Sequence, residues 1–283
     1  ALAKTLKAVR SHSDMPIAIQ LAHAGRKASV AQPWHGGGQL ALDAGGWQTI
    51  APSPVAFDGH ARQPRALTSD DIARLCEQFA EAARRSVRLG FAAIELHAAH
   101  GYLMHQFLSP LSNRREDDFG GSLENRMRFP LAAFKAVKAV VPAGYPVGVR
   151  LSATDWVPGG WDLEQTLAFS QALKARGADF IHVSSGGNSG AQQIPLGPNY
   201  QVPFARAVKQ ATGLPTIAVG LITEAEQAEA IVGTGDADLV GIARGILYDP
   251  RWPWHAAAQL GATVKVPNQY LRSQPRQFKT LFG

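Results

Sequence analysis

The chain has 283 residues, of which 46% are hydrophobic and 18% are charged. This composition excludes a disordered protein and supplies enough apolar side chains for one large core, which at this length is typical of an α/β barrel. The net charge is +6, but the lysines and arginines are scattered and form no stripe of the kind that binds nucleic acid.

The single cysteine, Cys76, excludes an internal disulfide and an iron–sulfur cluster bound by this chain alone. No stretch reaches about 18 consecutive apolar residues, the length of a membrane-spanning helix. The first residues, ALAKTLKAVRSHSD, lack the apolar core and cleavage site of a signal peptide. We therefore expect a cytoplasmic protein that does not insert into a membrane.

Short apolar runs rich in β-branched residues predict strands along the chain. They cover residues 16–22, 91–97, 145–152, 178–185, 214–220 and 237–243. Helical patterns lie between these runs, and several start at a predicted cap. The predicted capping groups are the pairs Thr68–Asp71 and Thr223–Glu226, and Asp162. Alternation of strand and helix predicts a parallel sheet with right-handed crossovers, and no GxGxxG motif follows a strand to indicate a Rossmann site.

Side-chain alternation divides each predicted strand into an aliphatic face and a mixed face. In the second strand Ile94 and Leu96 share one face, whereas Glu95 and His97 share the other. An aliphatic face toward helices and a polar face toward the interior are expected of a TIM (β/α)8 barrel, whose active site lies at the C-terminal ends of the strands. Two roles remain open for Glu95: a paired interior carboxylate or a direct part in chemistry.

The longest interruption of this alternation is residues 27–67, which are rich in Gly and Pro and have no helical period. Long loops with aromatic content in compact domains usually cover functional sites. We therefore predict an inserted lid or hairpin over the barrel mouth, with Trp34 and Trp47 packed inside it.

Residues 94–107 (IELHAAHGYLMHQF) place His97, His100 and Tyr102 where an apolar strand ends. HxxH spacing is compatible with a metal-dependent hydrolase, but no carboxylate at a strand end completes a ligand set, and we predict no metal. Alternatively, two neutral imidazoles can donate to one carbonyl or nitro oxygen while Tyr102 offers a proton. That second arrangement suits an electrophile that is being reduced.

Other predicted strand ends carry groups that suit a flavin. Gln20 can bond the edge of a pyrimidine-like ring, and Arg150 places a permanent positive charge where negative charge develops on flavin reduction. Gly220 ends one strand, and Ala243 and Arg244 follow the last one. Barrels commonly bind phosphate between the loops after their final two strands, so these residues are candidates for a phosphate site.

Several longer segments are diagnostic together: QLAHAGRKAS (20–29), HAAHGYLMHQFLSPLSNRREDDFGGSLENRMRF (97–129) and ARGILYDP near the end. With them, essentially the whole chain resembles the Old Yellow Enzyme family of FMN-dependent ene-reductases, which are TIM barrels. The SPLSNRR and GGSLENR segments are highly specific. The His97/His100 pair is similar to that of the bacterial subgroup of thermophilic-like ene-reductases and xenobiotic reductases.

The resemblance implies that Gln20 and Arg150 contact the FMN ring and that Ala243 and Arg244 hold its phosphate. It also implies a reaction in which NADPH or NADH reduces FMN, and reduced FMN then reduces the C=C bond of an α,β-unsaturated carbonyl or nitro compound.

In the same family, residues matching His97 and His100 bind the activating group of this alkene, and the residue matching Tyr102 is the candidate proton donor. In the subgroup a C-terminal arginine, which matches Arg272, reaches into the site of a neighbouring subunit. The resemblance thus implies a homo-oligomer, either a dimer or a tetramer.

A barrel of this family has eight strands, whereas about six βα units are recognisable in the single domain of residues 1–283. The chain opens inside a predicted helix, with Leu2, Leu6 and Val9 on one face and no capping residue before it. We therefore expect the first two βα units to be absent and FMN to bind weakly. A non-catalytic, incomplete barrel remains an alternative to an enzyme.

Overall fold

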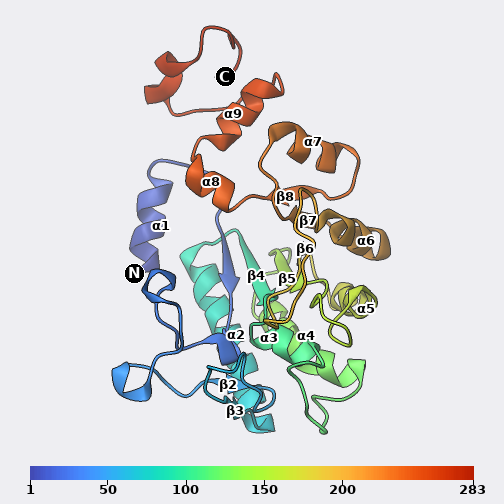
Figure 1. Cartoon of the computed structure of the whole chain (residues 1–283). Coiled ribbons are helices and arrows are strands. Elements are labelled where there is room, and N and C mark those ends of the chain that lie inside the picture. The colour runs from blue at the N-terminus through green and yellow to red at the C-terminus, as the bar shows by residue number, and fades with distance from the viewer.

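The computed structural model describes all residues from Ala1 to Gly283, and its centre is a curled sheet of parallel strands (Figure 1). The strand order is β1-β4-β5-β6-β7-β8. The strands are β1 (Ala18–Leu21), β4 (Ala93–Ala98), β5 (Val147–Ser152), β6 (Phe180–Ser184), β7 (Thr216–Val219) and β8 (Leu239–Gly241). Each matches a predicted run, with β4 extending one residue beyond its run of 91–97, so the six-stranded α/β architecture of an open TIM barrel is confirmed.

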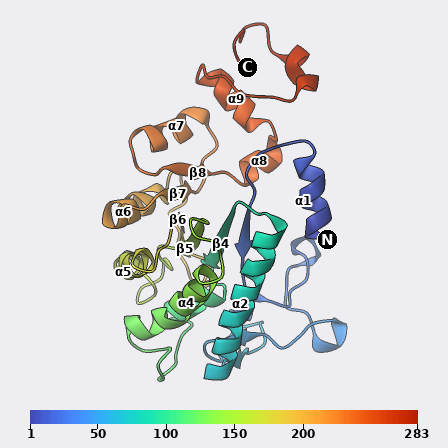
Figure 2. The same cartoon turned by 180° about the vertical axis from the view of Figure 1, so that it is seen from behind.

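Helices surround the outer face of this sheet, as Figures 1 and 2 show from opposite sides. The helices of the chain are α1 (Leu2–Arg10), α2 (Ser69–Leu89), α3 (Leu103–Leu108), α4 (Leu123–Lys138), α5 (Leu163–Lys174), α6 (Val202–Thr212), α7 (Ala225–Gly233), α8 (Arg244–Tyr248) and α9 (Trp252–Gln259). Of these, α8 and α9 lie beyond the β8 end of the sheet (Figure 1). Along the outside α2 contacts α4, α4 contacts α5, and α5 contacts α6. None of the helices combines the length and apolar character needed to cross a membrane.

The predicted aliphatic face forms the core between the sheet and these helices. Ile94 and Leu96 of β4 are fully buried there, as is Phe134 of α4. Burial of such side chains supplies the main driving force for folding, at roughly 1.5–3 kcal/mol for each one. The opposite face of the strands is left for the polar residues.

Two of the three predicted caps are confirmed. Thr68 accepts from the Asp71 amide while Asp71 accepts from the Thr68 amide, and Asp162 accepts from the Gln165 amide at 3.0 Å. The Thr223–Glu226 prediction is wrong by one residue, because α7 is capped by Glu224 with Gln227. The Gln227 side chain also bonds the Leu221 carbonyl and Asn199, which fixes it at the third position of the helix.

Residues 27–67 lie at one end of the sheet and contain little regular structure. Strand β2 (Ile50–Ala51) pairs in parallel with β3 (Arg65–Ala66), and an antiparallel bridge joins Val30 to Gln39. The prediction that two tryptophans pack inside this segment is wrong: Trp34 is 77% exposed and Trp47 is 55% exposed. Trp34 lies in a short 3-10 turn followed by three glycines, which offer no side chains to cover it.

The C-terminal segment packs on α9 and projects away from the sheet (Figure 1). Its 3-10 helix η4 (Asn268–Ser273) and final residues meet Trp254, whose ring lies 5.1 Å from the Tyr270 ring and 5.5 Å from the Phe282 ring. Arg251 stacks on both Trp254 and Tyr270. Aromatic contacts therefore attach this segment to the rest of the fold.

The packing of α4 yields a prediction on stability. Phe134→Ala should lower the free energy of unfolding by roughly 3–5 kcal/mol, because the ring is fully buried and its removal leaves a cavity. Urea unfolding followed by circular dichroism measures the change. Leu196→Ala is the control, since Leu196 is 70% exposed and its loss should cost less than about 0.5 kcal/mol. Equal losses in the two variants would contradict the assigned core.

Candidate functional site

The polar face of the sheet is organised by strand register. Parallel pairing places His97 of β4 opposite Arg150 of β5, and Arg150 opposite His182 of β6. Residues in register on adjacent parallel strands point the same way. The three side chains therefore form one row across the inner face of the sheet.

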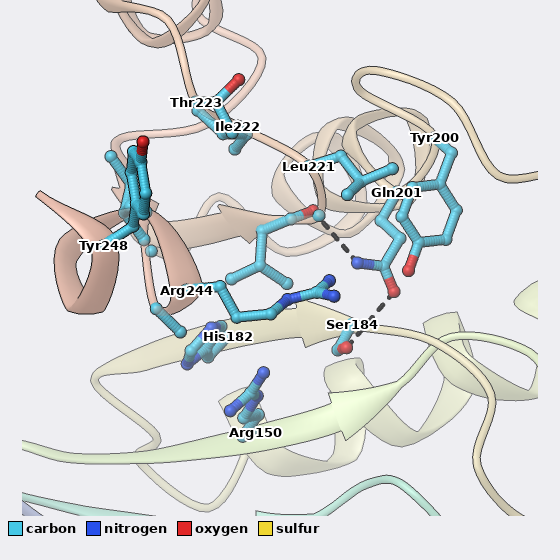
Figure 3. A pocket seen from close by; sticks show the side chains of 16 residues that line it. Arg150, His182, Ser184, Tyr200, Gln201, Leu221, Ile222, Thr223, Arg244 and Tyr248 are labelled. Carbon is cyan, nitrogen blue, oxygen red and sulfur yellow. Dashed lines mark hydrogen bonds between the residues drawn. The ribbon is translucent and has the colours of Figure 1, made fainter.

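A cavity of about 660 Å³ opens at the C-terminal ends of β5 to β8 (Figure 3). This volume lies within the roughly 300–1,000 Å³ typical of small-molecule sites. Arg150, His182 and Arg244 line it, and so do Gly220 and Ala243. Figure 3 shows the Arg150 and Arg244 side chains on the same cavity, as the sequence predicted for residues far apart in the chain.

Glu95 is the partner of two neighbours on this inner face. Its Oε2 lies 2.8 Å from His182 Nδ1, and its Oε1 accepts from Gln20 Nε2 at 2.5 Å. Burial would raise the pKa of Glu95, but the His182 hydrogen bond and charge, Gln20 and the nearby Arg150 outweigh burial and lower it. Of the two roles left open, the structure favours the paired interior carboxylate.

His97, His100 and Tyr102 form a cluster at the His97 end of the row. The His97 ring centroid lies 5.1 Å from that of His100 and 4.9 Å from that of Tyr102, both in edge-to-face geometry. His97 is 5% exposed, and its Nδ1 is buried without a protein partner. The sequence therefore predicted correctly that these three side chains meet.

Burial and the nearby Arg150 charge keep both histidines neutral. They lower the pKa of His97 to about 4 and that of His100 to about 2. Each ring then offers one N–H donor at neutral pH. Such uncharged donors suit a substrate oxygen on which charge develops only during the reaction.

The backbone that carries His100 is held in an uncommon conformation. His100 has φ +57°, a value that is costly for residues other than glycine, and its amide donates to Ser152 Oγ at 2.9 Å. The ammonium of Lys27 donates to the carbonyls of His100 and Gly187, both at 2.9 Å. Since strain of this kind persists only where neighbours determine it, Lys27 and Ser152 are part of the site's support.

The sequence analysis missed several residues that position the His100 side chain and its loop. Ser184 Oγ lies 2.7 Å from His100 Nε2. Gln201 accepts from Ser184 at 3.2 Å and donates to the Val219 carbonyl at 3.1 Å, and Figure 3 draws these two hydrogen bonds as dashed lines. Ser184 could have been inferred from its place at the end of a predicted strand. No local pattern points to Gln201 or Lys27, because the partners of Gln201 lie at the ends of β6 and β7 and those of Lys27 lie in distant loops.

Five predicted site residues do not line this cavity: the cluster of His97, His100 and Tyr102 lies beside it, and Gln20 and Arg272 lie elsewhere. Gln20 lines a separate cavity of about 300 Å³ between β1 and α2, although its hydrogen bond to Glu95 connects it to His182. Arg272 lies exposed in the C-terminal segment and lines neither cavity. A role for Arg272 in a neighbouring subunit's site stays a prediction.

The cavity has features that fit a phosphate-bearing, ring-shaped cofactor. Gly220 has φ +114°, and a Cβ there would lie 2.4 Å from Gln201 Nε2, so only glycine permits the backbone to line the wall at this point. Arg150 Nε and His182 Nε2 are buried without protein partners. Buried polar atoms are rarely left unpaired, and here a bound group with polar edges can satisfy them.

Comparison with known proteins decides the class of the chain. Residues 1–262 match the family described as the NADH:flavin oxidoreductase / NADH oxidase family. The chain belongs to this family. It is therefore a flavin-dependent oxidoreductase of the Old Yellow Enzyme type, with FMN as cofactor and a reduced nicotinamide as electron source, as the sequence predicted.

Curated relatives agree with this assignment. The chain is 43% identical over 256 residues to an NADPH dehydrogenase of Geobacillus thermodenitrificans, an alignment that covers 90% of this chain and 70% of the relative. It is 44% identical over 255 residues to an NADPH dehydrogenase of Listeria monocytogenes, with the same coverages.

Solved structures show the same fold. Morphinone reductase superposes with a TM-score of 0.72 at 29% identity, covering 99% of this chain and 72% of that structure. An Old Yellow Enzyme homologue from Zymomonas mobilis gives a TM-score of 0.72 at 25% identity and coverages of 98% and 76%.

The metal-dependent hydrolase alternative finds no support in the geometry. Nowhere in the chain do three or more His, Cys, Asp or Glu side chains come together in a way that could hold a metal ion. His97 and His100 have each other and Tyr102 as aromatic neighbours, and no carboxylate joins them as a third ligand. The family to which the chain belongs is one of oxidoreductases.

The neutral histidines make stability depend on pH. Unfolded histidine protonates near pH 6.5, whereas the native rings protonate only near pH 4 and 2, so below about 6.5 the unfolded state binds more protons. The free energy of unfolding should therefore fall as the pH decreases from 6.5, by up to about 1.4 kcal/mol per pH unit for each histidine.

A double variant, His97→Asn with His100→Asn, should show a shallower decrease between about pH 6.5 and 5, where most carboxylates are ionised in both states. Urea unfolding at several pH values and constant ionic strength gives the slopes. The same slope in the wild type and the double variant would show that the two rings are not neutral in the native state.

Proposed function

We propose that this enzyme uses NADPH or NADH, through FMN, to reduce the C=C bond of α,β-unsaturated carbonyl or nitro compounds. The observation that carries the proposal is the neutral His97/His100 pair beside a cavity lined by two arginines. Neutral donors suit an electrophilic oxygen, and permanent positive charges suit an anionic, phosphate-bearing cofactor. NADPH dehydrogenases and morphinone reductase among the similar proteins support this reaction class.

Arg244, Ala243 and Gly220 would hold the FMN phosphate. Gly220 and Ala243 bring main chain to the cavity wall, and Arg244 adds a guanidinium with several donors for phosphate oxygens. Arg150 would lie by the ring edge that becomes negative on reduction, with its unpaired Nε available for hydrogen bonding. Gln20 would contact the pyrimidine edge, oriented by its hydrogen bond to Glu95.

When bound, FMN supplies the two-electron exchange between the nicotinamide and the alkene. His97 and His100 bind the carbonyl or nitro oxygen of the substrate and stabilise the charge that develops on it. Tyr102, whose ring packs against His97, delivers the proton to the α-carbon. Ser184 and Gln201 orient the His100 ring through the hydrogen bond at Nε2.

The remaining assignments concern the assembled enzyme. Arg272 would complete the substrate site of a neighbouring subunit in a homo-oligomer, since its own segment projects away from the sheet (Figure 1). Residues 27–67 would act as a lid, anchored by Arg26, which donates to the Val55 and Ala56 carbonyls at 3.2 Å. The enzyme would work in the cytoplasm on small-molecule alkenes.

The proton-donor role predicts that Tyr102→Phe lowers the rate of alkene reduction by about 10²- to 10⁴-fold, because the phenolic proton is lost while the ring remains. Reduction of the flavin by NADPH should stay within about twofold. Anaerobic stopped-flow absorbance, with cyclohexenone as the test alkene, separates the two half-reactions.

Tyr145→Phe is the matched control, because Tyr145 lies before β5 and its hydroxyl bonds only the Phe91 carbonyl. An unchanged alkene rate in Tyr102→Phe would assign the proton to another donor. No alkene reduction by the FMN-loaded wild type would favour the non-catalytic alternative.

The phosphate assignment predicts that Arg244→Met weakens FMN binding by about 10- to 100-fold, as expected for loss of a charge-assisted hydrogen bond. Fluorescence quenching of added FMN measures the affinity. Arg84→Met, on the exposed face of α2, should leave it unchanged. Equal affinities in the two variants would place the phosphate elsewhere.

A further inference from the structure

A buried histidine and a buried aspartate lie behind the loop that carries His100 and Tyr102. His105 belongs to α3 and Asp155 to the loop after β5, and both side chains are 0% exposed. His105 Nε2 lies 3.0 Å from Asp155 Oδ1. Neither residue lines the cavity, so any effect on the reaction must pass through other residues.

The Gly101 amide on one side and the Asp155 carboxylate on the other determine the tautomer of the His105 ring. The Gly101 amide donates to His105 Nδ1 at 2.9 Å. A neutral imidazole has one acceptor nitrogen and one N–H, so an accepting Nδ1 places the ring proton on Nε2, which faces Asp155. Asp155 therefore selects the tautomer that can accept from Gly101.

Asp155 is itself held as an acceptor. Its Oδ2 accepts from Ser109 Oγ at 2.5 Å and from the Trp161 amide at 2.9 Å. Burial would raise the pKa of Asp155, but His105 and these two donors outweigh burial and lower it. An ionised Asp155 has no proton to donate, so its Oδ1, 3.0 Å from His105 Nε2, presents negative charge to that nitrogen and favours a proton there.

The pair of His105 and Asp155 contacts the candidate site through Gly101, which connects His100 to Tyr102. Gly101 has φ +70°, and a Cβ there would lie 2.3 Å from the Gly187 carbonyl oxygen. Its own carbonyl accepts from Gln106 Nε2 at 2.6 Å. Because the N–H and the carbonyl of Gly101 are both hydrogen-bonded, the peptide between His100 and Gly101 has one orientation.

We propose that His105 and Asp155 are positioning residues that fix the directions of His100 and Tyr102 through the Gly101 amide. The inference rests on the proposed function, which assigns catalytic roles to His100 and Tyr102. The pair exchanges no proton with substrate. Its contribution is a single ring tautomer that keeps the loop in one conformation.

The test is Asp155→Asn, which preserves shape but changes the hydrogen-bond pattern. The asparagine oxygen can still accept from Ser109 and Trp161, which turns its NH₂ toward His105 Nε2. His105 must then accept at Nε2 and carry its proton on Nδ1, where it opposes the Gly101 N–H. We expect ¹⁵N NMR of the imidazole to report this exchange of tautomers.

The same variant should show faster hydrogen exchange at the Gly101 amide, by at least about fivefold, because one hydrogen bond is lost. The rate of alkene reduction should fall by about 10- to 100-fold, as expected for a displacement of reacting groups on the order of 1 Å. Asp249→Asn is the matched control, since Asp249 forms a similar 2.6 Å pair with His255 on the surface.

A second pair of variants keeps the test decisive if Asp155→Asn does not fold. His105→Asn retains an oxygen near the position of Nδ1 and should preserve Gly101 protection, whereas His105→Leu removes the acceptor and should lose it. Equal Gly101 exchange in these two variants, or an unchanged tautomer and exchange rate in Asp155→Asn, would overturn the inference. Tautomer and exchange are measured without substrate, so they remain informative even if the alkene assignment fails.

Discussion

The parallel register of β4, β5 and β6 is the constraint on which the site depends. It aligns His97, Arg150 and His182 on the inner face of the sheet, so that one arginine lies between two histidines. A slip of one residue in any of these strands would turn the polar residues toward the helices and the aliphatic ones inward. The packing of Ile94 and Leu96 against the helices therefore fixes both the fold and the position of the chemistry.

Placing charges on this inner face requires partners, because burying an unpaired charge is costly. Glu95 meets this requirement with His182 on one oxygen and Gln20 on the other. Arg150 lies near the carboxylate and contributes to lowering the pKa of Glu95, while the same positive charge contributes to lowering those of His97 and His100. This one residue thus helps to keep Glu95 ionised and, together with burial, the two histidines neutral.

The fold could be predicted from the sequence because its signals are local. Strand parity identified both faces of β4, and Thr68 and Asp162 marked two helix starts. The Thr223–Glu226 prediction failed because the side chain at Gln227 is fixed by Asn199, which lies more than 20 residues earlier and outside any local pattern. The exposed Trp34 shows a different limit, since aromatic composition does not reveal whether other residues cover a ring.

Within the candidate site, the sequence pointed to the histidines and arginines at strand ends but not to Lys27 and Gln201, which hold loops and side chains around them. Histidines and arginines at strand ends carry a chemical signature in the sequence, and parallel strands bring such ends together. Lys27 has no such signature: its role exists only because the carbonyls of His100 and Gly187 converge on its ammonium.

The hydrogen bonds of Lys27 and Ser152 join the loops after β4 and β6. A Cβ on Gly187 would lie 2.6 Å from His100 Cα, so the two loops touch through backbone and leave no room for a side chain. Lys27 bonds a carbonyl from each loop, and Ser152 bonds both the His100 amide and the Gly186 carbonyl. Because every one of these contacts crosses between chain segments, the conformation of His100 is a property of the assembled barrel end and cannot be formed by residues 94–107 alone.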